Sequence, residues 1–244
     1  MYYDRKQKKV VEETSSKKKN DGTVEFTSHN SDESYRKIIK TMRVNNVEYN
    51  DVQKLDETLS VDEIIDKVGG GDKTGGSCAS LALTYAGNRN GLDVTDFRGG
   101  ISTSVFCSRS VMEDVCKLPN VKSYIDTGYN EMKSATKLLK SMEIDKEYIL
   151  GVGRHAAVVK HTNEGYFYLE LQTERDNGFK RLTANELKSR FRATKSIKIG
   201  GMKCEVKTYM IDVESLNGEE FRKILGYLNT KGNKQMKGVG GHAK

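Results

Sequence analysis

The 244-residue sequence predicts an α+β fold in which a group of helices precedes an antiparallel sheet. Most apolar segments between residues 33 and 142 have the three- and four-residue spacing of amphipathic helices. Between residues 147 and 213 the apolar runs are short, rich in β-branched and aromatic residues, and separated by turn residues, which is typical of successive strands. We therefore expect one α+β domain over residues 33–229.

The helical half begins at residues 31–43, where Tyr35, Ile38 and Met42 recur at helical spacing. The sequence from Ser60 to Glu63 is a capping box, which predicts the start of a second helix. This second helix is expected at residues 60–68, and further helices are expected at residues 78–86, 110–118 and 131–142.

The second half of the chain predicts a run of antiparallel strands joined by short turns. A second capping box at residues 183–186 opens a helix within this half, and a final helix is expected from about residue 217 to 229. Strands are expected at residues 147–153, 155–161, 165–172 and 203–213.

Basic, polar segments flank the expected domain, and they contribute much of the formal net charge of +7. We interpret residues 1–32 as a flexible extension and residues 230–244 as a flexible tail. Binding of these ends to nucleic acid or to an acidic partner is the alternative. With no apolar run of membrane-spanning length and no secretory signal at the start, we expect a cytoplasmic or virion-associated protein without membrane contact.

The chain has four cysteines, Cys78, Cys107, Cys116 and Cys204, and none of them stands at the spacing of a CxxC pair. Without an export signal, we expect free thiols in a reducing compartment. The spacing gives no support for a zinc site, so we expect neither a metal nor a cofactor.

Cys78 is the candidate nucleophile because of its position at the start of an apolar helix. The glycine-rich segment 69–77 precedes it, and free N–H groups at a helix N-terminus favour a thiolate. The N–H groups around Gly76 and Ser77 are also candidates for holding an oxyanion on a bound carbonyl. A buried cysteine that acts only as a small apolar residue is the competing interpretation.

His155 begins an apolar strand and is the candidate base, although a histidine at the rim of a sheet is the alternative. On the next strand, alternation places Glu170 and Gln172 on one face, and the hairpin folds that end back beside His155. Either side chain is a candidate for orienting the imidazole. Arg154, next to the base, is a candidate for guiding an acidic substrate, or else an ordinary surface residue.

The segments GGSCASLALTYA, GRHAAVV and GYFYLELQT together resemble the papain-fold toxins of bacteria and their phages. The resemblance covers roughly residues 69–195. It implies a papain-like fold, with the cysteine helix packed on an antiparallel sheet. It also implies that Cys78 is the nucleophile and His155 the base. Glu170 falls where the family has Asp, and Gln172 matches the Gln two residues later.

The resemblance further implies a cysteine hydrolase that acts on a protein amide, either a thiol protease or a glutamine deamidase. Such a protein would be a toxin or a phage-associated effector, with a protein substrate and with an immunity protein or a phage particle as further partners. A non-catalytic phage structural or packaged protein of the same fold is the main alternative, and basic ends would suit docking on an acidic capsid or nucleic acid.

An ADP-ribosyltransferase is the second alternative. Such enzymes use an Arg, a Ser-Thr-Ser strand and an acidic motif that ends in Glu. Arg98, residues 102–104 (Ser-Thr-Ser) and residues 172–174 (Gln-Thr-Glu) occur in this order. However, Arg98 precedes the serine motif by only four residues, whereas the two should lie on well-separated strands.

Overall fold

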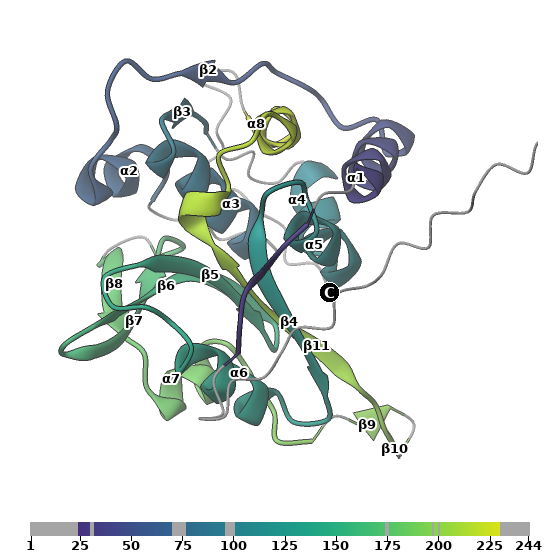
Figure 1. Cartoon of the computed structure of the whole chain (residues 1–244), viewed down its shortest axis with the longest axis vertical. Coiled ribbons are helices and arrows are strands. Elements are labelled where there is room, and N and C mark those ends of the chain that lie inside the picture. Colours follow the sequence, from purple (N-terminus) through teal and green to yellow (C-terminus); the bar gives the residue numbers. More distant parts are fainter. Residues whose placement is uncertain are drawn as a thin grey trace, which may run out of the picture.

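The computed structural model describes residues 24–29, 32–69, 77–95, 101–173, 176–196, 198–199 and 201–229. Within these residues, a seven-stranded antiparallel sheet is covered by helices on both faces (Figure 1). The predicted α+β class is therefore confirmed. In spatial order the strands are β1 (Thr27–Ser28), β4 (Lys122–Gly128), β11 (Val206–Asp212), β5 (Glu147–Val152), β6 (His155–Thr162), β7 (Gly165–Glu170) and β8 (Gly178–Arg181).

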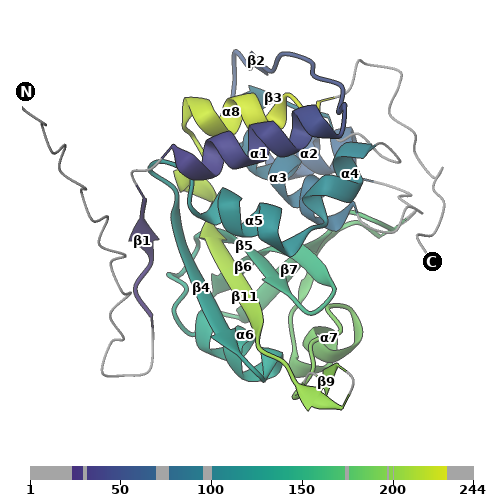
Figure 2. The same ribbon diagram turned by 90° about the vertical axis from the view of Figure 1, so that its right-hand side faces the viewer.

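One face of the sheet carries the larger helical layer, which Figure 2 shows stacked above the strands. A short ribbon of β2 (Gln53–Lys54) and β3 (Leu92–Asp93) lies at its outer edge. The 3-10 turn η1 (Val213–Ser215) leads from the sheet into this layer. The helices of the layer are α1 (Glu33–Val44), α2 (Val61–Val68), α3 (Cys78–Arg89), α4 (Ile101–Phe106), α5 (Arg109–Cys116) and α8 (Glu219–Leu225).

The opposite face is covered by α6 (Glu131–Leu139) and α7 (Ala184–Ser189), and a small hairpin of β9 (Lys198–Ile199) and β10 (Met202–Lys203) projects beside them (Figure 1). Strand β6 serves both cores because its side chains alternate. Ala156 and Val158 belong to the core under the larger layer, and Ala157 and Val159 belong to the core under α6 and α7.

Helix α3 lies at the centre of the larger layer and packs on β6. Its side chains from Ala79 to Asn88 are all buried. It continues past residue 86, where the expected helix ends, because Gly87 and Asn88 both fit a buried helix. Gly87 allows close packing, since a Cβ there would lie 2.6 Å from a methyl carbon of Leu225. Asn88 donates its amide to the carbonyl oxygens of Thr84 and Val94.

The domain begins earlier than residue 33, because β1 lies inside the segment that the sequence assigns to a flexible extension. Thr27 pairs with Ser123 of β4. Val24 is buried, and its N–H donates to the Ser141 hydroxyl at 2.8 Å. Residues 1–23 and the predicted tail 230–244 lie outside the described residues. In the part of the chain that the structure describes, no helix is long and apolar enough to cross a membrane.

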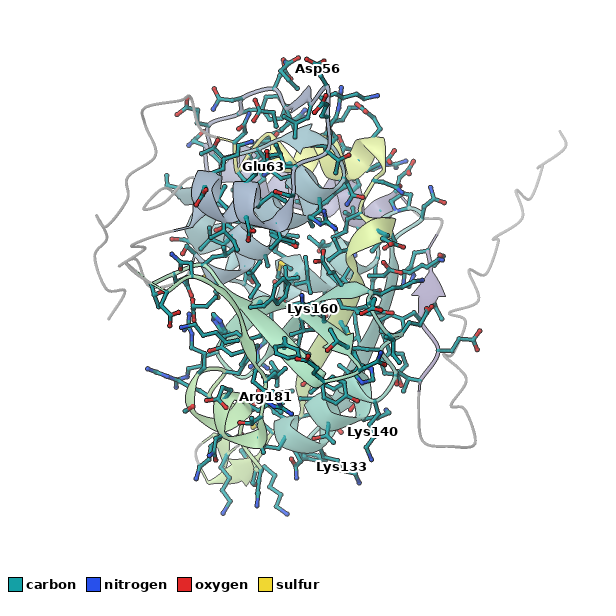
Figure 3. The ribbon with its side chains drawn as sticks, turned by 90° about the vertical axis from the view of Figure 1, so that its left-hand side faces the viewer. Asp56, Glu63, Lys133, Lys140, Lys160 and Arg181 are labelled. Carbon is teal, nitrogen blue, oxygen red and sulfur yellow. The ribbon has the colours of Figure 1, made fainter. Side chains whose placement is uncertain are left out.

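Figure 3 labels charged residues on both the helical half and the sheet half of one side of the molecule. The labelled acidic residues Asp56 and Glu63 lie on the helical half. The labelled basic residues Lys133, Lys140 and Arg181 lie on the sheet half. On the same side, Lys160 of β6 places its ammonium 3.9 Å from the ring centre of Phe179, a cation–π contact that covers this end of the sheet.

Candidate active site

Cys78 is the first residue of α3 and lies against the start of β6. Burial raises the pKa of its thiol. Hydrogen bonds from the backbone N–H groups of Ala156 and Ala79, and the charge of Arg190, lower the pKa of the thiol by less. The net direction is upward, which opposes the thiolate that a helix N-terminus is expected to favour. Desolvation outweighs the helix end because the sulfur lies between a helix and a sheet.

His155 is fixed by the tight turn that joins β5 to β6. Gly153 in this turn has φ 63°, and a Cβ there would lie 2.2 Å from the carbonyl oxygen of Phe191. The same carbonyl accepts the N–H of Arg154 at 2.8 Å, and Arg109 donates to the carbonyl of Gly153. The turn therefore requires glycine and is held from two sides.

The imidazole of His155 is buried and packs edge-on against Phe191, with ring centres 4.9 Å apart. Its Nε2 atom is enclosed and has no hydrogen-bond partner among the described residues. Burial, followed by the positive charge of Arg190, lowers the pKa of His155 to about 3, although Glu170 acts in the opposite direction. His155 is therefore a neutral imidazole at pH 7, with an unused polar atom.

Cys78 and His155 lie on different faces of the sheet but line the same spaces. Cys78 packs against the core under the larger helical layer, whereas Phe191, the contact of the imidazole, belongs to the core under α6 and α7. Among the described contacts, no hydrogen bond joins the thiol to the imidazole. Both residues border the same cavity and the same cleft, but they are neutral and are not hydrogen-bonded to each other.

A small cavity is lined by residues of α3, the start of β6 and the end of β7. The β6–β7 ladder ends where Val159 pairs with Tyr168, and beyond this pair the two strands separate. The gap holds a cavity of about 10 Å³, the space of roughly one water molecule. The four predicted site residues Cys78, His155, Glu170 and Gln172 all contribute to its lining.

Glu170 is buried and is held by Arg190, the residue that follows α7. Arg190 donates from Nε to Oε2 at 2.6 Å and from Nη2 to Oε1 at 2.9 Å. The N–H of Gln172 donates to Oε1 at 2.9 Å. Burial raises the pKa of Glu170, but these hydrogen bonds lower it by more, so the carboxylate is ionised at pH 7. No described hydrogen bond runs from Glu170 to His155.

Gln172 links this ion pair to the start of the cysteine helix. Its Oε1 accepts from Arg190 at 2.8 Å, and its Nε2 lies 3.1 Å from the hydroxyl oxygen of Ser77, to which it donates. Ser77 is fully buried, so its hydroxyl serves this network and does not face solvent. Gly76, the other residue predicted to border the oxyanion, lies outside the described residues.

A larger cleft of about 350 Å³ also borders Cys78. Arg154 contributes to its lining, together with residues that the sequence did not single out. Arg190 was missed as well, because nothing in its local sequence marks it as the partner of a buried carboxylate. The lining includes Cys78, Phe106, Cys107, Arg109, His155 and Tyr209.

The motif of the ADP-ribosyltransferase alternative does not have the expected structure. Residues 102–104 lie within α4, whereas that hypothesis needs them on a strand. Arg98 and Glu174 lie outside the described residues. The four cysteines are free thiols, and the described residues contain no group of three or more side chains arranged to hold a metal ion.

In comparisons with known proteins, no family model, no curated protein and no solved structure matches this chain.

Proposed function

We propose that the protein is a cysteine hydrolase of papain-like fold that acts on a protein amide, as a thiol protease or a glutamine deamidase. One observation carries the proposal. A cysteine at the N-terminus of a buried helix and a buried histidine with an unpartnered Nε2 border the same cleft. A purely structural histidine would normally satisfy both ring nitrogens. We infer the biological setting, a toxin or phage-associated effector, from the sequence resemblance alone.

The reaction begins with attack of the Cys78 sulfur on the amide carbonyl carbon. Because thiol and imidazole are both neutral in the free protein, the thiol proton passes to His155 during the attack. The N–H groups at the start of α3 stabilise the oxyanion. The proton then moves from His155 to the leaving amine or ammonia, which leaves a thioester on Cys78. Water, activated by His155, hydrolyses the thioester and restores the thiol.

For this transfer the imidazole turns away from Phe191 and comes within hydrogen-bond distance of the sulfur. The neutral His155 makes no described hydrogen bond that would resist this turn. Gln172 lines the small cavity beside His155, whereas both carboxylate oxygens of Glu170 already accept from Arg190. We therefore assign the orienting role to Gln172, and we assign to Glu170 the role of holding Arg190 in place.

Expression in a bacterial host tests this function. Wild-type protein, Cys78→Ala and the matched variant Cys107→Ala are compared by mass spectrometry of host proteins, scored for deamidated glutamine and for new termini. Cys107 is a suitable control because its exposed thiol lines the same cleft. We expect products with wild type and Cys107→Ala and none with Cys78→Ala. Equal products with Cys78→Ala would overturn the proposal.

A non-catalytic binding protein of the same fold is the second candidate. The favouring observation is that Cys78 and His155 are not hydrogen-bonded, while Arg190 occupies both carboxylate oxygens of Glu170. This candidate predicts no chemical products with any variant, together with copurification of the same host or phage-particle proteins by wild type and Cys78→Ala.

A further inference from the structure

The charged side chains among the described residues that line the cleft beside Cys78 are all positive. Its lining includes Arg109, Arg154 and Lys207, and no Asp or Glu is among the described lining residues. The positive side chains come from three separate elements of the chain: α5, the β5–β6 turn and β11. Convergence of three cations on one concave site raises the local concentration of anions there.

Two of these cations are balanced by carboxylates outside the lining. Arg109 lies 2.9 Å from a carboxylate oxygen of Glu131, and Lys207 lies 2.5 Å from one of Glu113. Arg109 also donates to the carbonyl of Gly153, so it is fixed in the wall of the cleft.

Arg154 differs from the other two cations. It is exposed, and no carboxylate lies within ion-pair distance of it in the described part of the chain. Its backbone is held by Phe191, and it immediately precedes His155. The backbone of Arg154 is therefore fixed beside the reacting residues, and its guanidinium makes no hydrogen bond or ion pair with the described residues.

The remaining lining favours an extended organic ligand over a small inorganic anion. Phe106, Met112 and Tyr209 contribute apolar surface to the same cleft. The ring of Tyr209 lies over Gly151, where a Cβ would be only 2.0 Å from the ring. A peptide segment with an acidic group would place its apolar atoms on this surface and its carboxylate at Arg154.

We infer that the cleft selects a peptide segment that carries a carboxylate next to the amide attacked by Cys78, with Arg154 as the residue that recognises the carboxylate. The statement about attack rests on the proposed function. The preference of the cleft for an anionic ligand does not, and it can be measured without a known substrate.

The first test compares two alkylating reagents of similar size, the anion iodoacetate and the neutral iodoacetamide. Alkylation rates at Cys78 are measured by mass spectrometry on freshly reduced protein. The rate with iodoacetate is divided by the rate with iodoacetamide, and this ratio is then divided by the ratio measured in the same way for 2-mercaptoethanol. We expect this normalised ratio to be about 10 at low salt. It should fall toward unity at about 1 M salt, where charges are screened within a few ångströms.

Arg154→Glu should reduce this ratio to below that of the free thiol. The matched control is Arg181→Glu, which makes the same change of charge. Arg181 is exposed on β8 and pairs with Phe167, which pairs in turn with Lys160, so it lies toward the end of β6 opposite to His155 (Figure 3). The ratio should be unchanged in this control. A wild-type ratio near unity, or equal ratios in the two variants, would overturn the inference.

Cys107 separates failure of the inference from failure of the proposed function, because it lines the same cleft. If neither reagent alkylates Cys78 while Cys107 shows an anion preference that Arg154→Glu removes, the inference stands and the nucleophile assignment fails. If Cys78 reacts at equal normalised rates with both reagents, the inference fails and the nucleophile assignment stands.

Protection by peptides identifies the source of the carboxylate. Short peptides that differ only by Glu against Gln, each with a free or an amidated C-terminus, compete with alkylation in the cleft. Protection by the amidated Glu peptide, lost in Arg154→Glu, supports an acidic side chain. Protection only by peptides with a free C-terminus would assign the cleft to a terminal carboxylate. No protection by any of the four would overturn the inference.

Discussion

Arg190 holds Glu170 with two parallel hydrogen bonds, of 2.6 and 2.9 Å, and thereby connects the end of α7 to the strand that borders the candidate site. Glu170 is almost completely buried, so its negative charge depends on this partner. Replacement of Arg190 by Met should lower the free energy of unfolding by about 3 kcal/mol, because it leaves a buried carboxylate unpaired. Urea unfolding measures the effect.

The double variant Arg190→Met with Glu170→Gln serves as the control for this prediction. It removes both charges, so its loss of stability should be clearly smaller than that of Arg190→Met alone. Equal losses would show that the ion pair does not account for the effect of Arg190.

The pKa of His155 gives the fold a dependence on pH. The folded protein keeps this imidazole neutral down to about pH 3, whereas the unfolded chain binds the proton near the usual value of 6.5. The contribution of His155 to the free energy of unfolding should therefore be complete above pH 6.5 and should decrease as the pH falls from 6.5 toward 3. Each pKa unit corresponds to about 1.4 kcal/mol, so the total effect is a few kcal/mol.

Urea unfolding across this interval, compared between wild type and His155→Gln, measures that contribution. The slope against pH should be shallower in His155→Gln, since glutamine does not titrate. Glu170 has its pKa lowered, so its own contribution is lost only at more acidic pH, as the pH falls below the usual value of 4.5. Parallel curves above pH 4.5 would contradict the assignment to His155.

Gly151 should not tolerate a side chain. A Cβ on this residue would lie 2.0 Å from the Tyr209 ring, which packs over the strand. Gly151→Ala should therefore reduce stability by about 1–3 kcal/mol, because the ring must move within a packed core. Gly128→Ala is the matched control, since a Cβ there meets nothing closer than 3.8 Å. Equal stability of the two variants in urea unfolding would contradict the packing described here.

Gln172 should matter for the rate of reaction under the proposed function. Gln172→Ala should lower kcat by at least about tenfold, because an unoriented imidazole transfers the proton inefficiently. Gln172→Glu keeps an oxygen acceptor and should therefore retain more activity than Gln172→Ala. The dependence of its kcat on pH should differ from that of wild type. Because Gln172 also contacts Ser77 and Arg190, unfolding curves of both variants must accompany the kinetics. Unchanged kcat in a folded Gln172→Ala would assign the residue to structure alone.

Features set by local sequence could be predicted. The start of α2 follows from the capping box of Ser60 and Glu63, whose reciprocal hydrogen bonds are present. Strands β5 to β7 follow from apolar runs separated by turn residues. These features depend on neighbours in the chain, so the sequence is sufficient to find them.

Features set by tertiary contacts could not be predicted. Strand β1 is short and polar, and only its pairing with β4 makes it part of the sheet. The partnership of Glu170 with Arg190 joins residues from separate elements. The pKa of the Cys78 thiol is raised because α3 is buried, and a helix N-terminus in the sequence does not reveal how much water reaches it.

The most direct test of the central claim is the rate of Cys78 alkylation by iodoacetamide in wild type and in His155→Gln, read by mass spectrometry with Cys107 as the internal reference. If His155 accepts the thiol proton, Cys78 should react on the order of tenfold more slowly in the variant, while the rate at Cys107 is unchanged. Equal rates at Cys78 in the two folded proteins would show that the two residues do not act as a pair.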